Sequence, residues 1–227
     1  PAELPPLPSR ELEPLRGVER VEVRHRGDEE VRLIWRTVAQ GHPDADALLL
    51  ADMMLDNDST GLLDTRLEQP QKVRGAGAWS GPRVLGGTET VWGRPRVGQS
   101  LEQVEALLLE QVQALREGDF RDEDLHALIR NFEVGELRRL ESNSARAAQL
   151  IDVFTQGEDW DHARTRLARL AAIDRAQISA AAKRWLGDDY VVAYRREGEP
   201  EVRKIPVLGL SQITLDSASH SSLFHEV

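Results

Sequence analysis

The residues best suited to metal-dependent chemistry are the histidines at positions 25, 42, 126, 162, 220 and 225. Zinc-dependent hydrolysis commonly uses two histidines on one helical face and a glutamate that activates water, spaced H-x-x-E-H or H-E-x-x-H. No histidine begins either motif, and His220 and His225 lie in a segment without a clear helical pattern. Because the chain has no cysteine, a structural zinc site is also disfavoured. We therefore predict no catalytic residue, no cofactor-binding residue and no metal ligand in this chain.

A second candidate is the polar run from Asp56 to Gly61, which resembles the start of a calcium-binding loop between two helices. Such a loop requires a bidentate glutamate at its twelfth position. That position is Leu67, and Glu68 comes one residue too late. Asp, Asn, Ser and Thr compete for backbone hydrogen bonds, and Gly61 can adopt the left-handed conformation that ends helices. We predict a helix-ending turn here, with calcium binding as the minor alternative.

Other reactive patterns have structural explanations. Ser59 and Thr60 have no nearby histidine that would activate a hydroxyl, so nucleophilic catalysis is not expected. Gly86-Gly87 lacks the remainder of a phosphate-binding loop and is predicted to be a hairpin bend. The acidic groups at the starts of predicted helices suit the positive end of the helix dipole: Asp122, Glu123, Asp124, Glu158, Asp159 and Asp161.

Arginine and tryptophan are the remaining candidates for binding. We expect most of the arginines to be solvated, with contacts to a neighbouring domain or to peptide carbonyls as the alternative: Arg138, Arg139, Arg164, Arg166, Arg169, Arg195 and Arg196. We expect the tryptophans to be core or interdomain anchors rather than a ligand box: Trp35, Trp79, Trp92, Trp160 and Trp185.

Composition limits the classes of partner. The chain has 227 residues, of which 40% are hydrophobic and 30% charged, which suits one large or two small domains. Its net charge of −10 argues against nucleic acid, whose phosphates need a basic surface. No apolar run approaches the ~20 residues that a membrane span requires. The composition does not indicate a cellular compartment.

The hydrophobic pattern predicts strands and helices in separate groups. Residues 18–39 are predicted to be a hairpin with a half-buried first strand, followed by helices at 43–57 and 61–69 and strands at 72–80 and 85–92. Further helices are predicted at 100–117, from 122 to about 140, from 144 to Gly157, at 160–171 and at 174–186, before a strand at 190–194. This order predicts an α+β fold with a mainly antiparallel sheet covered on one face by helices.

Two phrases in this order resemble a known family. The first is Asp58-Ser59-Thr60-Gly61-Leu62-Leu63 with Leu67 four residues on, a polar turn between a long and a short helix. The second is Ile173–Ile178 and Ala182–Leu186, followed by Gly187 and Tyr190-Val191-Val192. Together with the element order, these phrases resemble the αβ-roll of insulinase-like (pitrilysin-type) zinc metallopeptidases over roughly residues 12–227.

The missing zinc motif makes this chain similar to the non-catalytic second domain of the N-terminal half in that family. The resemblance implies that zinc belongs to the catalytic domain of a parent protein, and that the partners are other domains of the same polypeptide and a peptide substrate. It also implies a Pro-rich connecting segment at 1–16, the domain at 17–200, and a linker at 201–227 that contains Ser221–Phe224. The alternative function is a zinc-less core or assembly subunit built on the same roll. Whether the chain corresponds to the second or the fourth domain of such a peptidase stays open.

Overall fold

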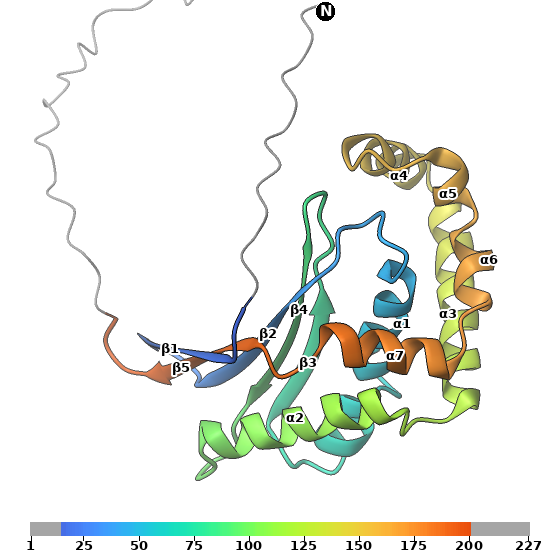
Figure 1. Ribbon diagram of the computed structural model, residues 1–227. Coiled ribbons are helices and arrows are strands. Elements are labelled where there is room, and N and C mark those ends of the chain that lie inside the picture. The colour runs from blue at the N-terminus through green and yellow to red at the C-terminus, as the bar shows by residue number, and fades with distance from the viewer. Residues whose placement is uncertain (1–14, 201–227) are drawn as a thin grey trace, which may run out of the picture.

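The computed structural model describes residues 15–200 (Figure 1). Its strands are β1 (Val18–His25), β2 (Glu30–Thr37), β3 (Gly75–Ser80), β4 (Gly87–Arg94) and β5 (Tyr190–Glu197). Its helices are α1 (Ala45–Leu55), the short π-helical η1 (Asp64–Glu68), α2 (Leu101–Glu117), α3 (Asp122–Glu141), α4 (Asn143–Thr155), α5 (Trp160–Arg164), α6 (Arg166–Ala171) and α7 (Arg175–Trp185). The predicted α+β class and the mainly antiparallel sheet are confirmed.

The strands form one sheet in the order β1-β5-β2-β4-β3, so the predicted hairpin at 18–39 is wrong. β5 lies between β1 and β2, and it pairs in parallel with β1 and antiparallel with β2. β5 buries Tyr190, Val192 and Tyr194 and therefore suits a central position. β1 alternates its valines with charged side chains, which suits a sheet edge because charges there oppose pairing with other chains.

The prediction that β1 is half-buried is also wrong. Every residue of β1 is exposed, and the side chains of Val18, Val21 and Val23 are 42%, 47% and 50% exposed. Besides its pairing with β5, the strand is tied to the body by Arg20, which donates hydrogen bonds to the Tyr194 hydroxyl at 2.9 Å and to the Glu105 carboxylate of α2 at 3.1 Å.

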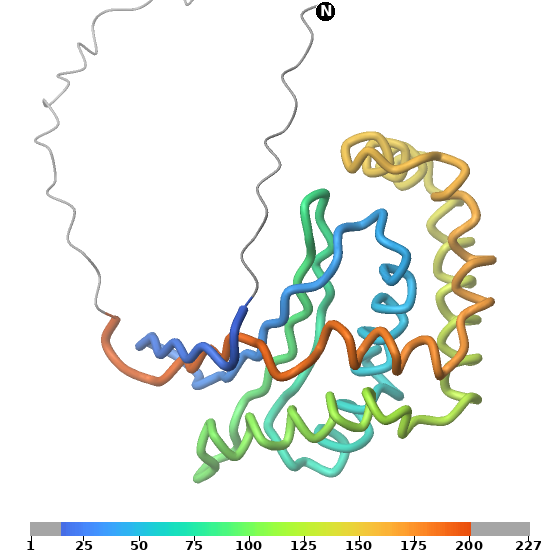
Figure 2. Tube along the Cα trace, viewed as in Figure 1, coloured from blue at the N-terminus to red at the C-terminus, as the bar shows by residue number. Residues whose placement is uncertain are grey.

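Helices α1, α2 and α7 cover one face of the sheet, as Figures 1 and 2 show. The alternate side chains Val31, Leu33 and Trp35 of β2 are fully buried beneath these helices. The close approach of α2 explains Gly93 of β4, because a Cβ there would lie 2.6 Å from Val104. The predicted single covered face is therefore confirmed.

The predicted helix signals near α2 and α7 are present in the structure. Ser100 and Gln103 form a capping box at α2, and Asp174 and Gln177 form one at α7. Gly118 ends α2 in the left-handed conformation, with φ 74°. These caps fix where both covering helices begin on the sheet.

Helices α3–α6 form an arm that stands away from the sheet (Figure 2). The predicted helix at 160–171 is divided at Thr165 into α5 and α6. The predicted apolar faces of α3 and α4 are only partly buried: Leu125 and Leu128 lie in the core, whereas α4 has no buried residue. No helix within residues 15–200 is long and apolar enough to cross a membrane.

Candidate functional site

The histidines of the described region come from four different segments of the fold. His25 ends β1, His126 lies in α3, and His162 lies in α5 with its Nδ1 at 2.9 Å from Glu158. His42 accepts a hydrogen bond from the Asp44 backbone N–H at 3.0 Å. Within residues 15–200, no three or more His, Cys, Asp or Glu side chains are grouped so that they could hold a metal. The predictions for His220 and His225, and for the linker at 201–227, lie outside the described residues.

The polar run after α1 is a turn organised by one carboxylate. Asp64 Oδ2 accepts hydrogen bonds from the backbone N–H groups of Asn57, Ser59 and Gly61 at 3.3, 3.1 and 2.9 Å. The three N–H groups already occupy this carboxylate oxygen, and their positive ends would repel a cation placed beside it. The geometry therefore favours the predicted helix-ending turn over calcium binding.

Gly61 does not have the role that we predicted for it. The left-handed residue of the turn is Asp58, with φ 63°, whereas Gly61 is absent from the positive-φ residues of the described chain. Gly61 is needed because the turn returns to the end of α1, so that a Cβ would lie 2.5 Å from the Leu55 carbonyl oxygen. Tight backbone contact, and not handedness, explains this glycine.

A buried pair of carboxyl groups lies between α1 and β4. Glu89 is 1% exposed, and Asp52 lines a cavity of about 240 Å³ together with Glu158 and His162. Burial first, and then the charge of Asp52, raises the pKa of Glu89 well above its usual range. Burial also raises the pKa of Asp52 to about 6. The pair therefore holds on to protons at pH values where exposed carboxyl groups are ionised, with Glu89 the more strongly affected of the two.

The acid pair was missed from sequence, although a signal for it existed. Glu89 lies two residues before Val91, and side chains two apart on a strand share a face. Since Val91 is fully buried, Glu89 had to face the same core. Its partner Asp52 comes from a segment 37 positions earlier, so their proximity could only follow from the packing of α1 on the sheet.

Replacing Glu89 with glutamine should stabilise the protein at pH 8 and change little at pH 5. Because the folded state binds protons that the unfolded chain releases, the free energy of unfolding of the parent protein falls as pH rises above the ordinary carboxyl range. This fall continues through about 6, where Asp52 titrates, and through the raised pKa of Glu89. Each pKa unit of difference is worth about 1.4 kcal/mol, and glutamine removes the ionisable group while it keeps the shape. Thermal unfolding at pH 5 and pH 8 would measure this. Equal differences at both pH values would contradict the assignment.

The remaining predicted groups have mostly structural contacts. Asp159 caps α5 by accepting hydrogen bonds from the backbone N–H groups of Asp161 and His162 at 2.7 and 3.2 Å. Trp35 is fully buried and donates from Nε1 to the Gly187 carbonyl oxygen at 2.8 Å. Trp79 and Trp160, in contrast, are 41% and 46% exposed, so they are not core anchors of this domain.

No protein-family model matches the chain, and no curated protein matches it. Solved structures do match. A protease from Helicobacter pylori is similar with a TM-score of 0.79 at 16% identity, over 86% of this chain and 48% of that one. A peptidase M16 inactive domain from Pseudomonas fluorescens has a TM-score of 0.72 at 15% identity, and the match covers 89% of this chain and 48% of that one. The inactive peptidase domain of a protein from Bordetella parapertussis that is named as a zinc protease has a TM-score of 0.67 at 17% identity. That match covers 79% of this chain and 98% of the Bordetella chain.

The chain spans about half the length of the first structures that it matches. It covers nearly all of the Bordetella domain, so the likeness extends over a whole structural unit. The two phrases that resemble the insulinase-like family form the turn after α1 and the end of α7 with β5, both within the matched architecture. Residues 15–200 therefore have the fold of the inactive domains of M16 peptidases.

Proposed function

We propose that this chain is a non-catalytic domain of a larger zinc metalloendopeptidase, in which it packs on the zinc-bearing domain and helps to enclose a peptide substrate. The observation that carries this proposal is the fold shared with an M16 inactive domain, over 89% of this chain. The proposed domain is residues 17–200, joined to its neighbours by segments 1–16 and 201–227. Zinc belongs to the neighbouring catalytic domain.

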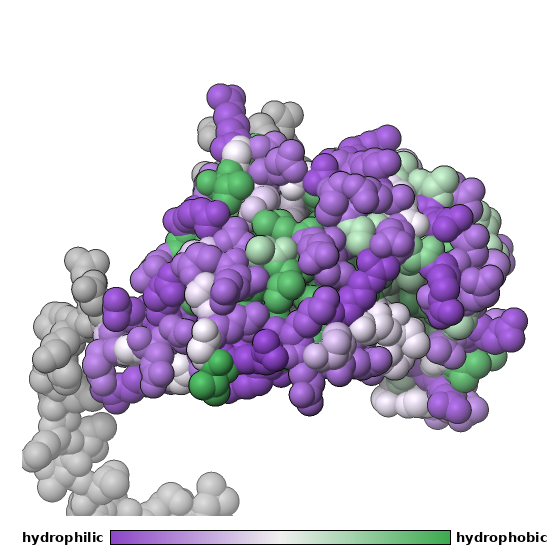
Figure 3. Space-filling view, turned by 90° about the horizontal axis from the view of Figure 1, so that it is seen from below, coloured by the Kyte–Doolittle hydropathy of each residue, from purple (hydrophilic) through white to green (hydrophobic). Residues whose placement is uncertain are grey.

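An exposed apolar surface on the arm supports packing against another domain. Figure 3 shows a largely hydrophilic face, with hydrophobic side chains confined to smaller groups. The arm instead exposes a series of large apolar side chains, which we call the arm surface: Val134, Leu137, Leu140, Leu150, Ile151, Phe154 and Trp160. Phe154 is 85% and Ile151 60% exposed. Such a concentration marks a contact surface, and the other half of a matched protease is a suitable occupant.

The alternative is a zinc-less core or assembly subunit built on the same roll. The full gene that encodes this chain and its neighbouring genes distinguish the two functions. We expect one of them to encode a second roll with an H-x-x-E-H helix. Zinc analysis of the complex purified through this chain should then give one zinc per pair of rolls. A complex purified through this chain that contains neither zinc nor an H-x-x-E-H polypeptide would favour the alternative and contradict our proposal.

A further inference from the structure

The face of the sheet opposite the helices carries a group of arginines, although the chain has a net charge of −10. In β2, Leu33 and Trp35 point into the core, so Arg32 and Arg36 point to the open face. By the same alternation, Arg94 of β4 and Arg195 of β5 lie on that face, because Gly93 meets α2 and Tyr194 is buried. We call Arg32, Arg36, Arg94 and Arg195 the arginine face.

Carboxylates compensate only part of this charge. Glu30, 2% exposed, accepts from Arg32 at 2.7 Å, from Arg94 at 3.0 Å and from Arg195 at 3.3 Å. Burial opposes ionisation of Glu30, but the hydrogen bonds from Arg32 and Arg94 outweigh it, so its pKa is lowered. Arg36 makes no ion pair with any side chain of residues 15–200. By the alternation that places Arg195, Glu197 of β5 also lies on this face. Four arginines against two carboxylates leave the arginine face with a positive excess.

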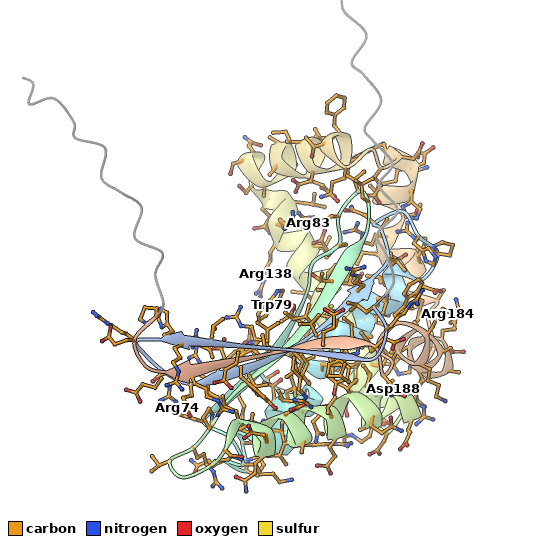
Figure 4. All side chains as sticks on the ribbon, turned by 60° about the vertical axis from the view of Figure 1, so that its left-hand side comes forward. Arg74, Trp79, Arg83, Arg138, Arg184 and Asp188 are labelled. Carbon is orange, nitrogen blue, oxygen red and sulfur yellow. The ribbon has the colours of Figure 1, made fainter. Side chains whose placement is uncertain are left out.

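Aromatic rings hold two of these arginines in place. The Arg32 guanidinium lies 5.4 Å from the centre of the Trp79 ring, and that of Arg94 lies 4.9 Å from the centre of the Trp92 ring. Trp92 covers Gly77, where a Cβ would lie 2.6 Å from its Nε1. Figure 4 shows Trp79 on the sheet, away from Arg184 and Asp188 near α7. Arginines fixed in this way lose little side-chain freedom when an anion binds.

We propose that the arginine face binds acidic segments of extended peptides. Guanidinium groups pair with carboxylates in a planar, two-bonded geometry. Arg32 and Arg36 are four residues apart on one strand, so they lie about 13 Å apart and can meet acidic side chains four residues apart on an extended peptide. Asp28 and Glu199, beside the face, are already paired with Arg74 and Arg26. A long nucleic acid would extend beyond the face over the rest of a chain whose net charge is −10, which disfavours its binding. The inference rests on the proposed function for its substrate class.

Fluorescence anisotropy with the purified chain tests this proposal. The probes are a labelled twelve-residue peptide of alternating glutamate and alanine, the same peptide with glutamine for glutamate, and a twelve-nucleotide single-stranded RNA. We expect the glutamate peptide to bind at least tenfold more tightly than the other two, and more weakly as salt is raised. Arg36→Glu should weaken its binding at least tenfold. Lys183→Glu, an equal charge change on the exposed side of α7, should weaken it less than twofold.

Equal affinity for the glutamate and glutamine peptides would overturn the proposal. So would tighter binding of the RNA, or an equal loss in Arg36→Glu and Lys183→Glu. Unfolding temperatures of both variants within about 2 °C of the parent chain's would show that the fold is intact, since surface changes rarely cost more than about 0.5 kcal/mol. Because the assay uses no zinc domain and no cleavage, its failure leaves the proposed peptidase role separately testable.

Discussion

The double replacement Leu137→Asp and Phe154→Asp should weaken association with the zinc-bearing domain at least a thousandfold and leave the isolated chain as stable as before. Each large apolar side chain buried at an interface is worth about 1.5–3 kcal/mol, and each new carboxylate would be desolvated without a partner. The two side chains are 57% and 85% exposed in the chain itself, so its core does not depend on them. Co-purification and calorimetric titration would measure the loss.

Val97→Asp provides the matched control. Val97 is fully exposed, in the loop before α2 and away from the arm. It places one aspartate on an exposed apolar position of the same protein, as each single arm replacement does, and association should stay within twofold of the parent chain's. Equal losses in the control and in the arm variant would mean that the arm surface has no special part in docking.

Asp64→Ala should lower the free energy of unfolding by about 3 kcal/mol. The buried N–H group of Gly61 would lose a hydrogen bond to a carboxylate, which is worth about 1.5–3 kcal/mol, whereas the part-buried N–H groups of Asn57 and Ser59 could replace most of theirs with water. For a folded unit of this size, the unfolding temperature should fall by about 6–12 °C. Asp64→Asn keeps one acceptor oxygen and should recover part of the loss.

The same thermal scans test calcium binding at the turn. Since Asp64 is occupied by backbone donors, millimolar calcium should shift neither the parent chain nor Asp64→Asn. A calcium-dependent rise in the unfolding temperature of the parent chain, or a loss below about 1 kcal/mol in Asp64→Ala, would contradict the structural account of this segment.

Local signals were enough to predict most elements of the fold. Ser100 with Gln103, Asp174 with Gln177, and Gly118 mark helix ends by hydrogen bonds that form within a few residues. The order of the strands could not be predicted in this way. Residues 18–39 have the pattern of a hairpin, and only the later β5, with its buried Tyr190, Val192 and Tyr194, displaces β1 to the edge.

The candidate sites show the same division between local and distant information. The sequence correctly favoured a turn over a calcium loop at 56–61, because Leu67 stands where the loop needs a glutamate. This comparison involves residues of one short segment only. The pairing of Asp52 with Glu89, and the meeting of Arg32, Arg94 and Arg195 around Glu30, depend on side chains from separate strands and helices. Leu137 and Phe154 follow the helical spacing of the apolar residues in α3 and α4, yet both are exposed. Such spacing cannot distinguish a domain core from a surface that binds a partner.

The most direct test of the central claim is a peptide-cleavage assay with three samples: this chain alone, the H-x-x-E-H polypeptide that we propose accompanies it, and the two together. We predict no cleavage and no bound zinc for this chain alone, little cleavage by the zinc polypeptide alone, and a large gain when the two are combined. Cleavage by this chain alone with stoichiometric zinc, or full activity of the zinc polypeptide with no effect of this chain, would contradict the account.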